Sequence, residues 1–159
     1  MSQKPTAEET ALWQRRLAGQ ANNRAWSLAE ATSRTSEEDE EMLQAAHAAA
    51  YLWRDVGNRN NEAHAAQLLA HVYAFLGLPN PAAHYLSKSE PLLLSDDAAP
   101  WERALAHAVA ANVAYAGRDE EGYNNHYQMA VELAAALPNP EERSILEATL
   151  RVLPAPACQ

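Results

Sequence analysis

Residues 101–137 read WERALAHAVAANVAYAGRDEEGYNNHYQMAVELAAAL. Alanine is the commonest residue of this segment and valine its only β-branched one, whereas strands are usually filled with β-branched side chains. Apolar and aromatic residues then recur every three to four positions, on one helix face, at Tyr123, Tyr127, Ala130, Ala134 and Leu137. Gly117 and the polar Arg-Asp-Glu-Glu run after it interrupt the pattern, so the segment predicts two helices joined by a tight turn.

The same bias extends over all 159 residues, which include 35 Ala and 19 Leu but only six Val and one Ile. This composition argues against an all-β or a parallel α/β fold, and the length suits one domain. The pattern predicts seven helices, at 6–33, 37–56, 60–76, 81–93, 100–116, 119–137 and 141–153. Because the loops between them are short, consecutive helices are expected to pack as antiparallel neighbours. We therefore predict an all-α array of helical hairpins in one domain, residues 1–153, followed by a frayed tail at 154–159.

Glycine and proline residues mark the expected helix ends. Three glycines follow apolar-rich stretches and are expected to form left-handed C-terminal caps: Gly57, Gly77 and Gly117. Gly19 lies inside the first predicted helix and is a candidate break. Ser36 is expected to cap the helix that begins with the acidic run Glu37–Glu41, whose carboxylates are favoured by the helix dipole. Pro81, which follows Asn80, is expected to begin the fourth helix.

Two segments resemble tetratricopeptide repeats. In the clearer one, AANVAYAGRDEEGY at 110–123 is followed by YQMAVEL at 127–133, which gives the family's aromatic residue before a turn glycine and its aromatic-x-x-Ala-x-x-Leu stretch. It departs from the family by one extra residue in the second helix and by Gly122 near the usual alanine. The second segment is VYAFLGLPNPAA at 72–83. Residues 37–78 are also similar to short, uncharacterised bacterial helical proteins. The resemblance implies a tetratricopeptide-like fold and brings no known activity.

Charge and hydropathy narrow the function classes. The chain has 21 acidic and 12 basic residues, a net charge of −9, whereas nucleic-acid binding normally requires a basic face. No apolar run approaches the roughly 20 residues needed to span a membrane, and the opening residues MSQKPTAEET lack the apolar core of a secretory signal. The single cysteine, Cys158, lies next to the end of the chain. We therefore expect a cytoplasmic protein with neither nucleic-acid nor membrane partners.

The six histidines are the main candidates for a functional site. None of them has another His, Cys, Asp or Glu three or four positions away, so we predict no metal site and no cofactor. Four polar residues share one strip of the second helix, and two histidines of the third helix are expected to face that strip across a groove. Two further residues of the fifth helix extend this surface. The predicted binding residues are thus Glu40, His47, Tyr51, Arg54, His64, His71, Asn112 and Tyr115.

Three functions are open at this point. We favour a non-catalytic protein-binding or self-association module of the tetratricopeptide type. The scarcity of lysine then favours a basic or apolar partner segment over a carboxylate. The alternative is a small-ligand binder or an enzyme that uses the histidine-lined groove between helices, with His47 or His71 as general base. No known catalytic motif supports an enzyme, and we assign no catalytic residue. The third possibility is a structural homo-oligomer that buries the apolar face at the end of the array.

Overall fold

The computed structural model describes residues 4–154, which contain seven α-helices and no β-strand. The helices are α1 (Ala7–Ala29), α2 (Ser36–Val56), α3 (Arg59–Phe75), α4 (Pro79–Leu93), α5 (Pro100–Ala116), α6 (Glu120–Ala136) and α7 (Pro140–Val152). The predicted all-α fold is confirmed, and every helix starts within two residues of its predicted position. The first helix ends four residues earlier than predicted and continues unbroken through Gly19. Apart from Pro154, the predicted tail lies outside the described residues.

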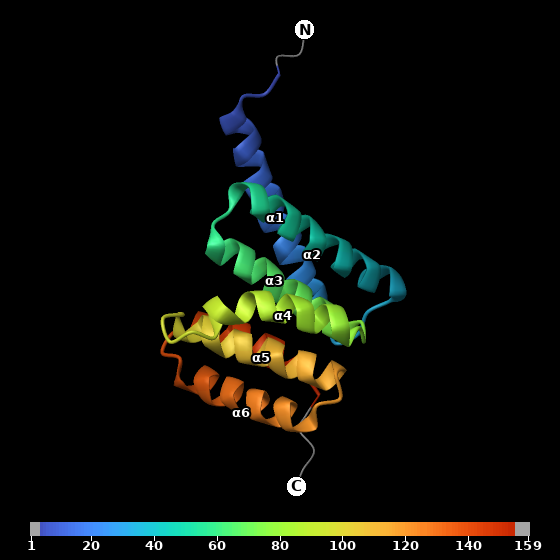
Figure 1. Cartoon of the computed structure of the whole chain (residues 1–159), viewed down its shortest axis with the longest axis vertical. Helices are drawn as coiled ribbons and strands as arrows, with labels where there is room; N and C mark the ends of the chain where they lie inside the picture. The colour runs from blue at the N-terminus through green and yellow to red at the C-terminus, as the bar shows by residue number, and fades with distance from the viewer. Residues whose placement is uncertain (1–3, 155–159) are drawn as a thin grey trace.

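Consecutive helices form three hairpins, α1–α2, α3–α4 and α5–α6, which stack along the long axis of the molecule (Figure 1). The first helix of each hairpin also packs against the first helix of the next, so α1, α3, α5 and α7 are successive neighbours. The last helix, α7, has no hairpin partner and packs against α5 and α6. Helices α1, α3, α5 and α7, which we call the odd-numbered helices, thus make one continuous layer of the array.

The starts of α2 and α4 differ from the prediction for local reasons. Thr35, and not Ser36, caps α2: its hydroxyl accepts from the backbone N–H of Glu38, and the Glu38 carboxylate accepts from the N–H of Thr35. This reciprocal pair satisfies two N–H groups that the first helical turn leaves free. Helix α4 begins at Pro79, and Pro81 occupies its third position. Proline is tolerated there because the first-turn N–H groups have no intrahelical acceptor.

Only one of the three predicted left-handed glycine caps is present. Gly77 has φ of 70° and ends α3 as expected. Gly57 has an extended backbone, and glycine is needed there because a Cβ atom would lie 2.5 Å from the carbonyl oxygen of Trp53. Gly117 is right-handed, and the next residue, Arg118, takes the positive φ of 60°. The prediction was therefore wrong at Gly57 and Gly117, because glycine permits several conformations and its position alone does not select one.

Alanine fills the interfaces between the helices. Fully buried alanines occur on six of the helices, among them Ala25, Ala46, Ala70, Ala82, Ala108 and Ala130. Their small side chains let the backbones approach closely, and larger residues such as Met42, Leu68 and Leu146 fill the remaining space. Trp26 of α1 packs against three of the apolar clusters, around Leu68, around Val109 and around Leu146. It therefore joins the first hairpin to the centre and the end of the array.

Candidate functional site

Two tryptophans from different helices line a cavity of about 380 Å³. We call it the tryptophan cavity and define it by its lining residues, which come from all four odd-numbered helices: Asn22, Asn23, Trp26, Glu30, His64, Trp101, Leu105, Ile145 and Thr149. Ile145 is 47% exposed, so the cavity is open to solvent beside α7. Ligand pockets start at roughly 300 Å³, and a cavity of this size accepts one side chain or a similarly small group.

His64 is the predicted site residue that lines the tryptophan cavity. Its Nε2 donates to Oε1 of Glu102 at 2.7 Å, and its ring stacks on Trp101 with centroids 5.6 Å apart and planes 9° apart. The other oxygen of Glu102 accepts from the backbone N–H of Ala99. Burial acts to raise the pKa of Glu102, but the hydrogen bonds from His64, Ala99 and Asn60 outweigh it and hold this pKa below its ordinary value. The carboxylate is therefore ionised near neutral pH and fixes the ring of His64.

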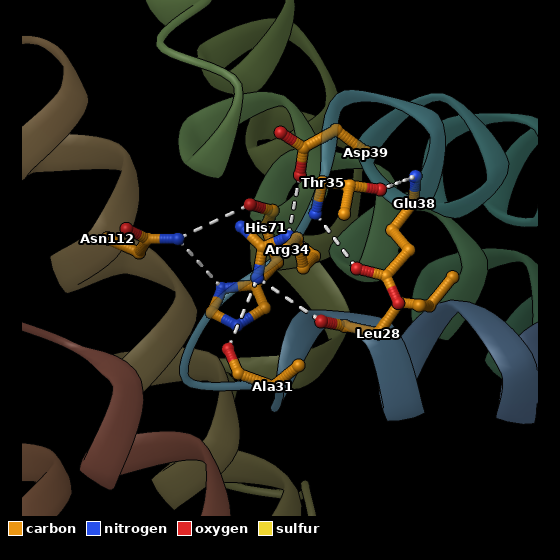
Figure 2. A network of polar contacts seen from close by, with 8 residues as sticks. All are labelled: Leu28, Ala31, Arg34, Thr35, Glu38, Asp39, His71 and Asn112. Carbon is orange, nitrogen blue, oxygen red and sulfur yellow. Dashed lines mark hydrogen bonds and ion pairs between the residues drawn. The ribbon is translucent and has the colours of Figure 1, made fainter.

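His71 lies in the core, where the structure brings it together with the predicted residue Asn112 (Figure 2). Nδ2 of Asn112 lies 3.1 Å from Nδ1 of His71 and donates to the carbonyl oxygen of His71 at 3.3 Å. Because that carbonyl can only accept, the amide must present its NH₂ group there, and Nδ1 is also an acceptor. The proton of the neutral ring is then on Nε2, which has no hydrogen-bond partner among the described residues.

A cation lies next to this buried ring. The Arg34 guanidinium donates to the carbonyl oxygens of Leu28 and Ala31 and to the Asp39 carboxylate, so it closes the connection between α1 and α2 (Figure 2). Burial, and secondarily the Arg34 charge, lowers the pKa of His71 from 6.5 to about 3. The ring of His71 is thus neutral at physiological pH, and it is closed off from solvent.

The groove expected between α2 and α3 is not formed by the predicted histidines. His47 of α2 does face α3, but its Nε2 lies 2.7 Å from the hydroxyl of Tyr73. Meanwhile His71 is 0% exposed and His64 points to α5. Each of the three predicted histidines thus has a different partner: Tyr73 for His47, Glu102 for His64 and Asn112 for His71.

The other predicted residues of α2 lie on the surface. Glu40 accepts from the side-chain amide of Gln44 on the next turn of the same helix. Tyr51 is 59% exposed, and the guanidinium carbon of Arg54 lies 4.8 Å from the centroid of its ring. These contacts are all local to α2, so the structure does not bring Glu40, Tyr51 or Arg54 together with the tryptophan cavity.

Tyr115 lines a second cavity, of about 710 Å³, at the turns that follow α3 and α5. This turn cavity is lined by Ala74, Phe75, Gly77, Tyr115, Ala116, Arg118, Asp119, Glu120, Tyr123 and Asn124. Burial raises the pKa of Tyr123 to about 12, and its hydroxyl donates to the carbonyl of Pro154. Its lining carries charges of both signs, Arg118 against Asp119 and Glu120, which selects no one class of ligand. We therefore take the tryptophan cavity as the candidate site.

Two histidines outside the predicted set, His107 of α5 and His126 of α6, form a pair. Their Nδ1 atoms lie 2.9 Å apart, so one ring donates and the other accepts. Burial, and then the charges of His126 and Arg103, lowers the pKa of His107. Within residues 4–154, no group of three or more His, Cys, Asp or Glu side chains is placed to hold a metal ion. The pair is therefore a hydrogen bond between two helices of one hairpin.

Gln67 of α3 carries a fully buried amide, and neither its Nε2 nor its Oε1 has a partner among the described residues. A buried amide without hydrogen bonds is costly, whereas an apolar side chain of similar shape is not. We expect Gln67→Met to raise the free energy of unfolding by about 1 kcal/mol in urea titrations. Gln20→Met, on the exposed face of α1, is the matched control and should leave it unchanged. A Gln67→Met protein less stable than the wild type would show that a bound water satisfies the amide.

Of the nine residues that line the tryptophan cavity, sequence reasoning found only His64, and those it missed include Trp26, Glu30 and Trp101. The available signal was the spacing of four between Trp26 and Glu30, which places Glu30, the C-cap of α1, on the same side of the helix as Trp26. No local signal connects Trp101 to His64, since their contact depends on how α3 and α5 pack. The candidate site thus forms only where α1, α3, α5 and α7 pack together, and no single helix contains it.

The chain matches no family model, no curated protein and no solved structure. Within the described residues, no helix has both the length and the apolar character needed to cross a membrane. The fold class therefore rests on the helices and their pairing, and the site rests on the contacts given above.

Proposed function

We propose that the chain is a non-catalytic binding module of the tetratricopeptide type, whose odd-numbered helices hold an extended segment of a partner protein. One observation carries the proposal: α1, α3, α5 and α7 all contribute to the tryptophan cavity, which combines apolar walls with polar groups. Aromatic side chains in a partly closed pocket are the usual energetic centre of a protein interface. The stacked hairpins and the repeated helix–glycine–helix segments quoted above support the same interpretation.

The enzyme alternative receives less support from the histidines. A general base must reach its substrate, whereas His71 is enclosed in the core and Nε2 of His47 already lies against Tyr73. His64 lines the tryptophan cavity, but its Nε2 is held by Glu102. These contacts favour a structural role over proton transfer for His47 and His71, and leave Nδ1 of His64 as the one nitrogen of the three rings that the alternative could use at the cavity.

Self-association is a second candidate, because α1 carries exposed apolar side chains in its first half. Leu12, Trp13 and Leu17 are all exposed, and this part of α1 extends beyond the rest of the array (Figure 1). Exposed apolar patches of this kind often mark association surfaces. The patch and the tryptophan cavity lie at different ends of α1, so substitutions can separate the two functions.

The test is selection of linear peptides from a random phage-displayed library on the folded chain, followed by calorimetry with the selected peptides. We expect Trp101→Ala to weaken their binding at least about tenfold, because it removes one wall of the tryptophan cavity. Trp13→Ala, on the exposed patch, should leave binding unchanged. If circular dichroism shows that Trp101→Ala unfolds, Trp101→Leu replaces it.

Two outcomes would contradict the proposal. One is selection of no peptide that binds, and the other is binding that is insensitive to the substitution of Trp101. Sedimentation equilibrium of the same proteins tests the second candidate: a dimer in the wild type that dissociates in Trp13→Ala would assign self-association to the patch on α1.

A further inference from the structure

Glu30 places a carboxylate at the tryptophan cavity without an ion-pair partner among the described residues. It is the C-cap that follows the last residue of α1, and the helix dipole is negative there, so the helix does not stabilise its charge. Burial raises its pKa, and the charge of Arg151 acts in the opposite direction from α7 without a salt bridge. The carboxylate and the helix end together make this part of the cavity electronegative.

Aromatic rings lie beside this carboxylate. Trp26 precedes Glu30 by one helical turn and lines the same cavity, and Trp101 lines it from α5. The ring of Trp101 is fixed by its stack on His64, which is in turn held by Glu102. The faces of tryptophan rings carry partial negative charge and attract cations more strongly than other aromatic side chains do. The site therefore offers a carboxylate and two indole rings in fixed positions.

We propose that the tryptophan cavity binds an arginine side chain of the partner segment, with its guanidinium against Glu30 and its stem between Trp26 and Trp101. The inference rests on the proposed function and names the partner's anchoring residue. A guanidinium pairs with a carboxylate through two parallel N–H groups and also stacks flat on indole rings, which a lysine ammonium does less well. The side-chain oxygens of Asn22 and Asn23 are further acceptors at the same cavity.

The charges around the cavity favour an arginine side chain over an anionic or an apolar group. An anion would face Glu30 and the negative end of α1, and an apolar side chain would leave the half-buried carboxylate without a partner. A cation neutralises the carboxylate and covers the indole rings at the same time. The net charge of −9 adds a general attraction for basic segments, which increases the rate of association more than it selects a position.

The probes for the test are three peptides, acetyl-Ala-Ala-Ala-Xaa-Ala-Ala-Ala-amide with arginine, citrulline or leucine at the central position. Citrulline has the shape of arginine without its charge. Tryptophan fluorescence and calorimetry should show that the arginine peptide binds at least about tenfold more tightly than the other two. Glu30→Gln should abolish this preference, and Glu147→Gln, an exposed site on α7 with the same change in net charge, should retain it.

Each result of this experiment either supports or overturns the arginine pocket. Equal affinity for the arginine and citrulline peptides, a preference that survives Glu30→Gln, or no binding of the arginine peptide would each overturn it. The proposed function is decided separately by the library selection. Selected peptides that depend on Trp101 but bind as tightly after Glu30→Gln would uphold the module and overturn the arginine pocket.

Discussion

Lowering the pH from about 7.5 to about 5 is expected to reduce the free energy of unfolding by about 2 kcal/mol through His71 alone. The pKa of His71 is 6.5 in the unfolded chain and about 3 in the folded protein. Between these two values the unfolded chain binds a proton that the folded protein does not bind. The stabilisation is therefore complete above pH 6.5 and is lost as the pH falls toward 3. Urea titrations at the two pH values measure it.

Two variants separate the contribution of His71 to the acid sensitivity from the contributions of the other titrating groups. The pKa of His107 is also lowered by burial and adds to the loss, whereas the raised pKa of Glu30 acts in the opposite direction. His71→Gln removes the titrating ring but retains an acceptor for Asn112, so this variant should lose about 2 kcal/mol less on acidification than the wild type. His84→Gln, on the exposed face of α4, should behave like the wild type. Equal losses in the wild type and His71→Gln would show that Nδ1 is accessible to protons.

The helices were predictable because their signals are local. The spacing of apolar residues, the capping residues and the short loops each act within a few positions, and they located all seven helices. The conformation of Gly57 and Gly117 was not predictable in this way. It depends on the approach of the Trp53 carbonyl in the first case, and in the second on which residue of the turn takes the positive φ.

The candidate site was less predictable, because its contacts connect helices that are distant in sequence. The face of α3 that carries His64 and His71 was recognised, but the prediction turned it toward α2. In the structure these histidines contact Glu102 and Asn112, which lie 38 and 41 residues further along the chain. The hairpin order is consistent with either arrangement, and the packing of α3 against α5 determines which one occurs.

Asn112→Leu is expected to lower the free energy of unfolding by about 2 kcal/mol, because it leaves Nδ1 of the buried His71 without its donor. Leucine has the same branching as asparagine, so the effect reports the lost hydrogen bond more than a change of shape. Asn125→Leu, an exposed position on α6, is the control for the substitution itself and should change stability by less than about 0.5 kcal/mol. Urea unfolding at pH 7.5 provides the measurement.

The double variant Asn112→Leu with His71→Leu tests whether the two side chains act as a unit. Removing both partners leaves no unpaired polar atom of the pair in the core, whereas removing either one leaves an uncompensated group behind. The double variant should therefore be more stable than the sum of the two single effects predicts, by at least about 1 kcal/mol. Strictly additive effects would mean that the 3.1 Å contact between Asn112 and His71 contributes nothing to stability. In that case burial alone would account for the neutral ring, and the acid sensitivity expected from His71 would persist in Asn112→Leu.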